Sequence, residues 1–264
     1  MDEKWHEIDT FAKKAIKEAG RKIVDSFDEV LKIQTKSNVN DLVTNMDKQI
    51  EKYFVEQIDK HYPDHRVLGE EGFGDQIQDM LGTVWIIDPI DGTMNFVHQQ
   101  RNFAVSIGVF HEGEGKLGYI YDVVADELYH AQKGNGAFLN DEKLSPLKDV
   151  PIEEAIFSIN ATWLVPNRKV NHEQFIPLVH KVRGTRSYGS AAIELAYIAA
   201  GRLDGYISMR LSPWDFAGGK VLIEEVGGQL TDLNGEELSM VNNSHIFAGN
   251  PAVHQKVLKD YLNN

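Results

Sequence analysis

Val84-Trp85-Ile86-Ile87-Asp88-Pro89-Ile90-Asp91-Gly92-Thr93 joins an apolar run to two carboxylates and a Gly-Thr pair. The run Val84 to Ile87 is typical of a buried strand, which leaves Asp88 at its carboxyl end. Ligands of open α/β sheets collect at that edge. Asp88 and Asp91 can therefore converge on a hard cation, because such cations prefer carboxylate and carbonyl oxygens.

The Gly-Thr pair extends this pattern toward phosphate binding. Gly92 lets the backbone approach a ligand closely, and Thr93 can begin a helix whose free N–H groups suit an anion. Alternatively, Asp91-Gly92 is an ordinary turn after a core strand. A single motif does not separate these interpretations, so the presence of further carboxylates becomes the deciding question.

Two upstream segments carry candidate carboxylates. Val67-Leu68-Gly69-Glu70-Glu71-Gly72 contains adjacent glutamates, whose mutual repulsion a cation would relieve. A solvated acidic loop is the alternative for this pair. In Asp41-Leu42-Val43-Thr44-Asn45-Met46-Asp47, Thr44 and Asp47 are spaced as in a capping box. This spacing predicts a helix near residues 44–61, and Asp47 could both cap it and face a metal site.

A downstream segment adds one more carboxylate. In Ser212-Pro213-Trp214-Asp215, the aspartate falls in the first turn of an expected helix over residues 214–226. The helix dipole favours a carboxylate at that position, so Asp215 has a structural explanation as well as a functional one.

Taken together, these segments resemble the inositol monophosphatase family, part of the wider lithium-sensitive, magnesium-dependent phosphatase superfamily. Four segments carry the resemblance in family order: Asp41 to Asp47, Gly69 to Glu71, Asp88 to Thr93, and Trp214-Asp215. Supporting stretches are Asn95 to His98, Gly189 to Ala192, Gly201 to Asp204 and Glu225 to Gly228. The combination spans most of the chain and is far more specific than any one segment.

The resemblance implies a mixed α+β fold, a layered α-β-α-β-α sandwich, and usually a homodimer. The residue pattern agrees with a mixed fold, because strand-like runs dominate up to about residue 139 and strands alternate with helices after about residue 150. We expect residues 1–264 to form a single unit of two intimately packed halves. These are an α+β half over about 1–150 and an α/β half over about 151–264, with the metal ions between them.

The resemblance also implies two or three Mg²⁺ ions at one site. Glu70, Asp88 and the carbonyl of Ile90 would hold the first ion. Asp88, Asp91 and Asp215 would hold the second.

Three residues would take catalytic roles in the same way. Glu70, together with Asp47 through water, would help to hold a third and weaker ion. Thr93 and Asp47 would position the attacking water.

The implied substrate contacts fall in three groups. Asp91 and the N–H groups of Gly92 and Thr93 would lie against the phosphate. The pocket for the rest of the substrate would be lined by Gly189, Ser190 and Ala191.

The third group concerns specificity. Ser208 stands where inositol-hydrolysing members carry an acidic residue that contacts a ring hydroxyl. Arg210, or Arg183 and Arg186, could meet a second anionic group on a larger substrate. Ordinary surface ion pairing is the alternative for these arginines.

The predicted activity is Mg²⁺-dependent hydrolysis of inositol monophosphate or a similar small phosphate ester. Divalent ions neutralise the phosphate dianion and acidify a bound water, so we expect direct attack of metal-activated water and no phosphorylated enzyme. An NADP(H) 2′-phosphatase or a fructose-1,6-bisphosphatase-type activity is the alternative. A regulatory or RNA-associated scaffold is the alternative outside enzymes.

Composition narrows the possible partners and location. The formal charge is −13, from 40 acidic and 27 basic residues, which argues against nucleic-acid binding. The chain has no cysteine, which excludes disulfides and thiol catalysis. The first residues do not form a secretory signal, and no apolar run approaches the length of a membrane span. We therefore expect a cytoplasmic enzyme without a membrane partner.

Overall fold

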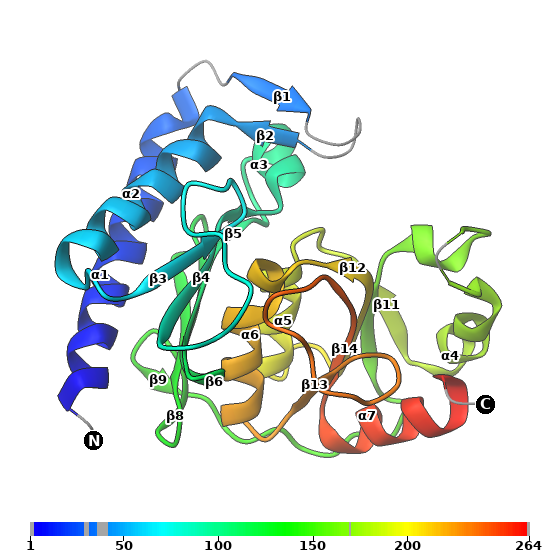
Figure 1. Ribbon diagram of the computed structural model, residues 1–264. Coiled ribbons are helices and arrows are strands. Elements are labelled where there is room, and N and C mark those ends of the chain that lie inside the picture. The colour runs from blue at the N-terminus through cyan, green and yellow to red at the C-terminus, as the bar shows by residue number, and fades with distance from the viewer. Residues whose placement is uncertain (1–2, 29–31, 36–41, 169, 263–264) are drawn as a thin grey trace.

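The computed structural model describes residues 3–28, 32–35, 42–168 and 170–262. Asp41, the first residue of the Asp41–Asp47 motif, lies outside these ranges. The described chain forms five layers, in which helices alternate with the two larger of its three sheets (Figure 1). The predicted α-β-α-β-α sandwich is therefore confirmed.

The larger sheet has seven strands in the order β3-β4-β5-β6-β7-β8-β9. Its strands are β3 (Arg66–Gly69), β4 (Thr83–Asp91), β5 (Ala104–His111), β6 (Glu114–Asp122), β7 (Glu127–Gln132), β8 (Gly136–Leu139) and β9 (Glu142–Lys143). Strands β3 and β4 are parallel, and all other neighbours are antiparallel. The strand-like runs that the sequence shows up to about residue 139 thus form a mainly antiparallel sheet.

One face of the larger sheet is covered by α1 (Glu3–Asp25) and α2 (Asn45–His61). Their apolar faces pack on side chains such as Trp85 and Ile87. Thr44 caps α2 in a complete capping box with Asp47, as its spacing predicts. Short elements lie beside these helices: η1 (Ser26–Asp28), β1 (Ile33–Thr35), β2 (Leu42–Thr44) and α3 (Thr93–Gln99).

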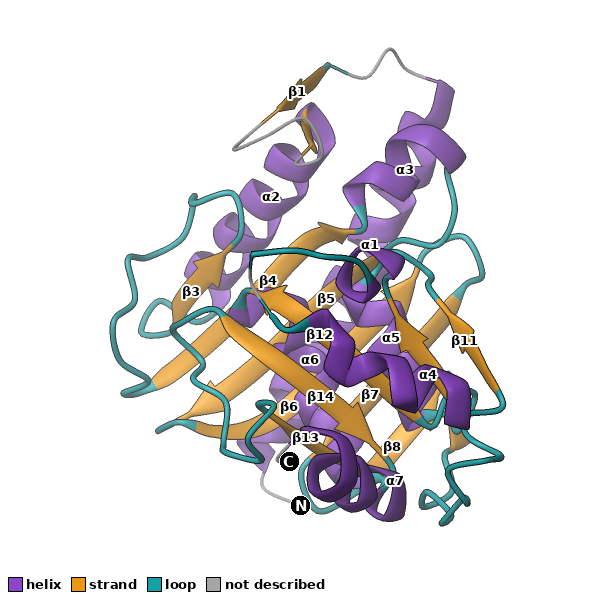
Figure 2. Cartoon of the chain, turned by 90° about the vertical axis from the view of Figure 1, so that its right-hand side faces the viewer, coloured by secondary structure: helices purple, strands orange, loops and turns teal. Residues whose placement is uncertain are grey.

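The smaller sheet has five strands in the order β11-β10-β12-β14-β13. These are β10 (Ile156–Ile159), β11 (Gly184–Arg186), β12 (Gly205–Leu211), β13 (Gln229–Thr231) and β14 (Ser244–Gly249). Strand β10 is parallel to both of its neighbours, and the other pairs are antiparallel. In the turned view, α4 (Ile176–Lys181) and α7 (Pro251–Val257) lie in front of this sheet (Figure 2).

The remaining short helices complete this half. They are η2 (Ala161–Leu164), η3 (His172–Phe175) and the π-helical η4 (Leu258–Leu262). Helix η3 leads directly into α4, without a loop between them. Within the described ranges, no helix combines the length and apolar character that a membrane crossing requires.

The middle layer consists of α5 (Ala191–Ala199) and α6 (Pro213–Glu225), which lie between the two sheets (Figure 1). Both helices are apolar on most sides, because they bury surface against both sheets. Helix α6 approaches strands β5 and β6 very closely. A Cβ atom on Gly118 would lie 2.4 Å from the carbonyl oxygen of Gly218, and one on Gly218 would lie 2.7 Å from the carbonyl oxygen of Tyr119. Backbone therefore meets backbone at this contact.

We expect Gly118→Ala to destabilise the protein, because the new methyl group would collide with the α6 backbone. Overpacking of this kind usually costs about 1–3 kcal/mol. Denaturant unfolding would measure the change. Gly184→Ala is the matched control, because a Cβ there meets only Arg186 Nη1 at 3.5 Å. Equal stability of the two variants would contradict the contact described here.

Candidate active site

A β-bulge places the two carboxylates of β4 on the same face of the sheet. Asp88 pairs with Ser106 and Asp91 pairs with Ala104, so two residues of β4 stand opposite one residue of β5. In a regular strand, residues three apart point to opposite faces. The extra residue of the bulge shifts the alternation of side chains by one position. As a result, Asp88 and Asp91 both face the middle layer.

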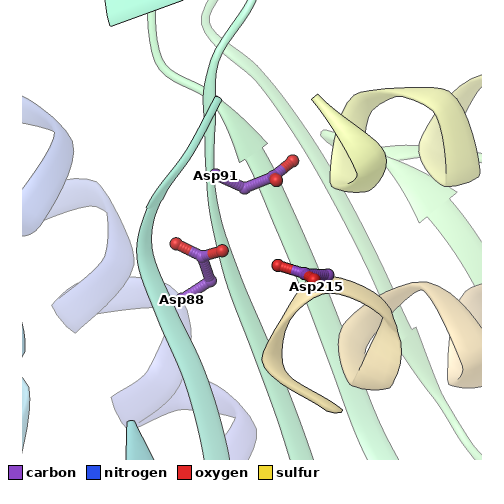
Figure 3. Close-up of side chains that lie close together, drawn as sticks. All are labelled: Asp88, Asp91 and Asp215. Carbon is purple, nitrogen blue, oxygen red and sulfur yellow. The ribbon is translucent and has the colours of Figure 1, made fainter. Parts of the chain in front are cut away.

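Asp215 approaches these two carboxylates from the first turn of α6 (Figure 3). One carboxylate oxygen from each of Asp88, Asp91 and Asp215 lies within 4.8 Å of the others. The three side chains point toward one another from a strand and a helix that are far apart in sequence. The structure therefore brings together three of the predicted metal ligands.

Backbone and hydroxyl donors hold each of the three carboxylates in place. Asp88 accepts a hydrogen bond from the N–H of Ile90 at 3.0 Å. Asp215 accepts one from the N–H of Ser212 at 2.7 Å, within the capping box of α6. Asp91 accepts hydrogen bonds from the Ser190 hydroxyl and from the N–H of Ala192, the latter at 2.7 Å.

Burial and mutual repulsion make this cluster unfavourable when all three groups are charged. The pKa of Asp91 is raised to about 7, and burial is the largest cause. Burial, reinforced by neighbouring carboxylates, also raises the pKa of Asp88 and of Asp215 well above the ordinary value. A cation bound among the three carboxylates would offset their mutual repulsion.

Asp47 and Thr93 are joined by a hydrogen bond of 3.0 Å from the Thr93 hydroxyl to the Asp47 carboxylate. The same hydroxyl lies 3.1 Å from the carbonyl oxygen of Ile90, so it has two acceptors within reach. Thr44 donates to the other oxygen of Asp47 through its N–H at 2.8 Å and its hydroxyl at 2.5 Å. Asp47 is buried, and burial raises its pKa.

Gly92 links β4 to α3 in a left-handed conformation, with φ of 92°. A side chain there would be strained, and a Cβ would lie 3.1 Å from Cβ of Ser190. The turn therefore brings Thr93 back toward Asp47 and places the 92–93 backbone beside the start of α5.

Glu70 lies beside Asp88 because β3 and β4 run in parallel register, with Gly69 opposite Ile87. Its N–H donates to the carbonyl oxygen of Ile87 at 3.3 Å. Among the described residues, it does not join the tight group that Asp88, Asp91 and Asp215 form. Its charge nevertheless contributes to the raised pKa of each of those three carboxyls.

A cavity of about 230 Å³ opens next to Asp91 and Asp215. Of the predicted pocket residues, Gly189, Ser190, Ala191 and Ser208 line it. Its other lining residues are Asn160, Trp163, Ser187, Glu194, Tyr206, Ile207 and Leu211. A larger cavity of about 790 Å³ lies between β13 and α7, but none of the three clustered carboxylates lines it.

The arginines considered for a second anionic group lie outside this cavity lining. A second register shift, between Ser208 and Leu211, separates Arg210 from the face that carries Ser208, and Arg210 is exposed. Arg183 pairs with Glu154 at 3.6 Å. Arg186 donates to the carbonyl oxygen of Thr185 at 2.8 Å.

Sequence reasoning missed several residues of the cavity wall. Trp163 lies in η2 and Asn160 is the N-cap of that helix, whereas Glu194 comes from the first turn of α5. Glu194 was detectable in principle, because a carboxylate inside the apolar sequence of α5 is unusual without a partner. It accepts a hydrogen bond from the N–H of Tyr188 at 2.7 Å and so supports the 188–190 loop.

Comparisons with known proteins agree with this geometry. The model of the inositol monophosphatase family matches residues 4–264. The inositol-1-monophosphatase of Bacillus subtilis (strain 168) is 60% identical over 258 residues, which are 98% of this chain and 97% of that protein.

More distant relatives carry other names. The fructose-1,6-bisphosphatase/inositol-1-monophosphatase of Thermotoga maritima is 32% identical, covering 94% of this chain and 93% of that protein. The Nus factor SuhB of Escherichia coli (strain K12) is 34% identical, covering 96% and 95%.

Solved structures show the same fold. The structure of SaIMPase-II bound to inositol monophosphate has a TM-score of 0.88 and 43% identity, covering 97% of this chain and 93% of that one. An IMPase/NADP phosphatase complexed with Mg²⁺ and phosphate has a TM-score of 0.90 and 30% identity, covering 97% and 95%. A LiCl-soaked inhibitory complex of staphylococcal inositol monophosphatase-1 has a TM-score of 0.90 and 30% identity, covering 98% and 96%. The chain therefore belongs to the inositol monophosphatase family, and it is a hydrolase of phosphate monoesters.

Proposed function

We propose that this phosphatase hydrolyses inositol monophosphate or a similar small phosphate ester with Mg²⁺, by direct attack of water on phosphorus. The observation that carries the proposal is the convergence of Asp88, Asp91 and Asp215 beside a cavity of about 230 Å³. The likeness to an inositol-1-monophosphatase at 60% identity supports the substrate class.

The residues present fit magnesium. Their donors are carboxylate oxygens, which this hard cation prefers, and it needs only a few of them. No lysine or arginine lines the cavity in the described part of the chain, so no cationic side chain there neutralises the cluster. We assign Asp88, Asp91 and Asp215 to one ion, and Asp88, Glu70 and the Ile90 carbonyl to another, with a third and weaker ion near Glu70. When bound, Mg²⁺ neutralises phosphate charge and lowers the pKa of water.

The chain itself would orient the nucleophile. The Thr93 hydroxyl donates to Asp47, which leaves its oxygen lone pairs to accept a hydrogen bond from water. Asp47 is fixed by both donors of Thr44, so the acceptor geometry at Thr93 is fixed in turn. The N–H groups of Gly92 and Thr93 would contact the phosphate.

The cavity wall would receive the rest of the substrate. Gly189, Ser190, Ala191 and Ser208 offer small or hydroxylated surfaces. Because Ser208 is uncharged, we infer a broader substrate range than inositol phosphate. Removal of the 2′-phosphate of NADP(H) and hydrolysis of fructose 1,6-bisphosphate are the alternatives, and relatives named for those activities support them.

A regulatory scaffold is a second candidate, favoured by the 34% identity to a protein named Nus factor SuhB. The net charge of −13 disfavours direct contact with nucleic acid. The presence of all the proposed carboxylate ligands favours catalysis. Binding of a partner protein together with negligible Mg²⁺-dependent phosphate release would reverse this order.

Other features stay predictions from the family resemblance. They are the homodimer, the cytoplasmic location and the single unit formed by halves of about 1–150 and about 151–264. Inhibition by lithium is proposed on the likeness to the LiCl-soaked inhibitory complex.

We expect Asp88→Asn to reduce Mg²⁺-dependent phosphate release from inositol 1-phosphate at least about 100-fold, since even residues that only support metal ligands change affinity or activity by about 10–100-fold. Asparagine keeps the size of the side chain but removes its charge. Asp59→Asn, an exposed position on α2, is the control. Near-normal turnover by a folded Asp88→Asn protein would refute the assignment.

We expect metal-free protein to lose stability as pH rises from about 4 to about 7. In the folded state Asp91 has a pKa of about 7, whereas the ordinary value is 3.8. The folded protein therefore binds a proton more tightly than the unfolded chain, and the stability that this proton contributes is complete at low pH and is lost as pH rises from about 4 to about 7. Thermal unfolding with a chelator, compared with excess Mg²⁺, would measure this. Identical pH profiles under both conditions would count against a cation in this cluster.

We expect Ser208→Glu to shift the ratio of rates toward inositol 1-phosphate over NADP and fructose 1,6-bisphosphate. The new carboxylate would accept a hydrogen bond from a ring hydroxyl and would repel a second anionic group. Arg210→Ala is the comparison variant. Because Arg210 is exposed and off the cavity face, its removal should change the ratio by no more than the small effect typical of surface charges. A large change in this ratio would show that Arg210 contributes to substrate binding.

A further inference from the structure

The loop that carries Glu70 forms hydrogen bonds to a buried carboxylate that has no role in the proposed reaction. Glu51, on α2, is fully buried. One of its oxygens accepts the N–H of Glu71 at 2.6 Å, and the other accepts the N–H of Phe73 at 2.7 Å. Both oxygens are thus committed to the backbone immediately after Glu70.

Gly69 allows this carboxylate to lie directly against the end of β3. A Cβ atom on Gly69 would lie 2.3 Å from the carboxylate carbon of Glu51. On its other side, Gly69 stands opposite Ile87 in the parallel ladder, one residue before Asp88. Glu70 is therefore held between the ladder on one side and, on the other, the two hydrogen bonds that the following backbone donates to Glu51.

Closure of this loop does not by itself require Glu51. Asp75 already returns the chain to β3: its carboxylate accepts the N–H of Val67 at 2.8 Å, and its N–H donates to the carbonyl oxygen of Val67 at 2.6 Å. Lys52 also lies over the ring of Phe73, at 4.5 Å from the centroid.

A carboxylate is an unfavourable choice for a purely structural contact at this place. Burial raises the pKa of Glu51, and the charges of Glu71 and Glu70 add to that effect. Burying a charge beside like charges is costly unless specific hydrogen bonds compensate. The two backbone donors supply that compensation, and they belong to the residues that determine where Glu70 points.

We propose that Glu51 is a positioning residue for Glu70: its two hydrogen bonds hold the loop so that the Glu70 carboxylate can share a magnesium ion with Asp88. This inference rests on the magnesium role proposed above for Glu70. Glu51 acts only through the loop and does not contact substrate or ion.

Glu51→Gln tests the proposal, because an amide nitrogen cannot accept a hydrogen bond and would face one of the two N–H groups. Titration calorimetry should show Mg²⁺ affinity lower by about 10–100-fold, the usual effect of losing a residue that orients a ligand. The kcat at saturating Mg²⁺ should fall much less than the affinity. Amide hydrogen exchange should accelerate at Glu71 and Phe73.

Glu225→Gln is the matched control, since the two oxygens of Glu225 accept the N–H groups of Gly134 and Gly136, each at 2.8 Å, at the end of α6 that is far from Asp215. It removes the same kind of contact and should leave Mg²⁺ affinity unchanged. Where Glu51→Gln does not fold, Glu51→Asp replaces it, because the shorter side chain keeps the charge but cannot reach both N–H groups.

Glu70→Gln and the double variant separate the two levels of the proposal. If Glu51 acts through Glu70, the double variant should bind Mg²⁺ no more weakly than Glu70→Gln. Unchanged affinity in Glu70→Gln would overturn the proposed role of Glu70 and this inference with it. A weakened Glu70→Gln together with a normal Glu51→Gln, or additive losses in the double variant, would overturn only the inference about Glu51.

Discussion

The close contact between α6 and strands β5 and β6 is the constraint on which the site depends. Gly118 and Gly218 bring the helix and the sheet together backbone to backbone, so the first turn of α6 reaches the edge where β4 ends. Larger residues at this contact would move α6 outward, and Asp215 would no longer lie within 4.8 Å of the β4 carboxylates. Packing in the middle layer thus sets the distance between groups that repel one another.

That repulsion explains why so many other contacts converge on the same place. Asp88, Asp91 and Asp215 each accept a backbone N–H, and Asp47 is held by Thr44 and Thr93. A cluster of buried carboxylates would separate if its supports were weak. The capping boxes of α2 and α6 therefore do more than begin helices, because their acidic members lie at the centre of the site.

Local sequence signals predicted much of this arrangement. They failed where the pairing of neighbouring strands decides the face to which a side chain points. The apolar run before Asp88, the capping spacing of Thr44 and Asp47, and the helix after Ser212 are all local, and the structure has them. The bulges in β4 and β12 are not local, since they exist only relative to β5 and β14. Consequently the sequence could not show that Asp88 and Asp91 share a face, or that Arg210 leaves the face of Ser208. Glu51 escaped notice because its partners are backbone groups 20 and 22 residues away.

The two sheets contribute to different parts of the site. Asp88 and Asp91 belong to β4 of the larger sheet, whereas Asn160, Trp163, Ser187 and Ser208 belong to the smaller sheet and its connections. Ser190 and Ala192 at the start of α5 join the two groups, because both donate hydrogen bonds to Asp91. A substitution at Asn160, Trp163 or Ser208 leaves the backbone donors to the three carboxylates in place. A lineage of such enzymes can therefore change the leaving group of its substrate through substitutions in the smaller sheet and its connections. The carboxylate cluster need not change with it.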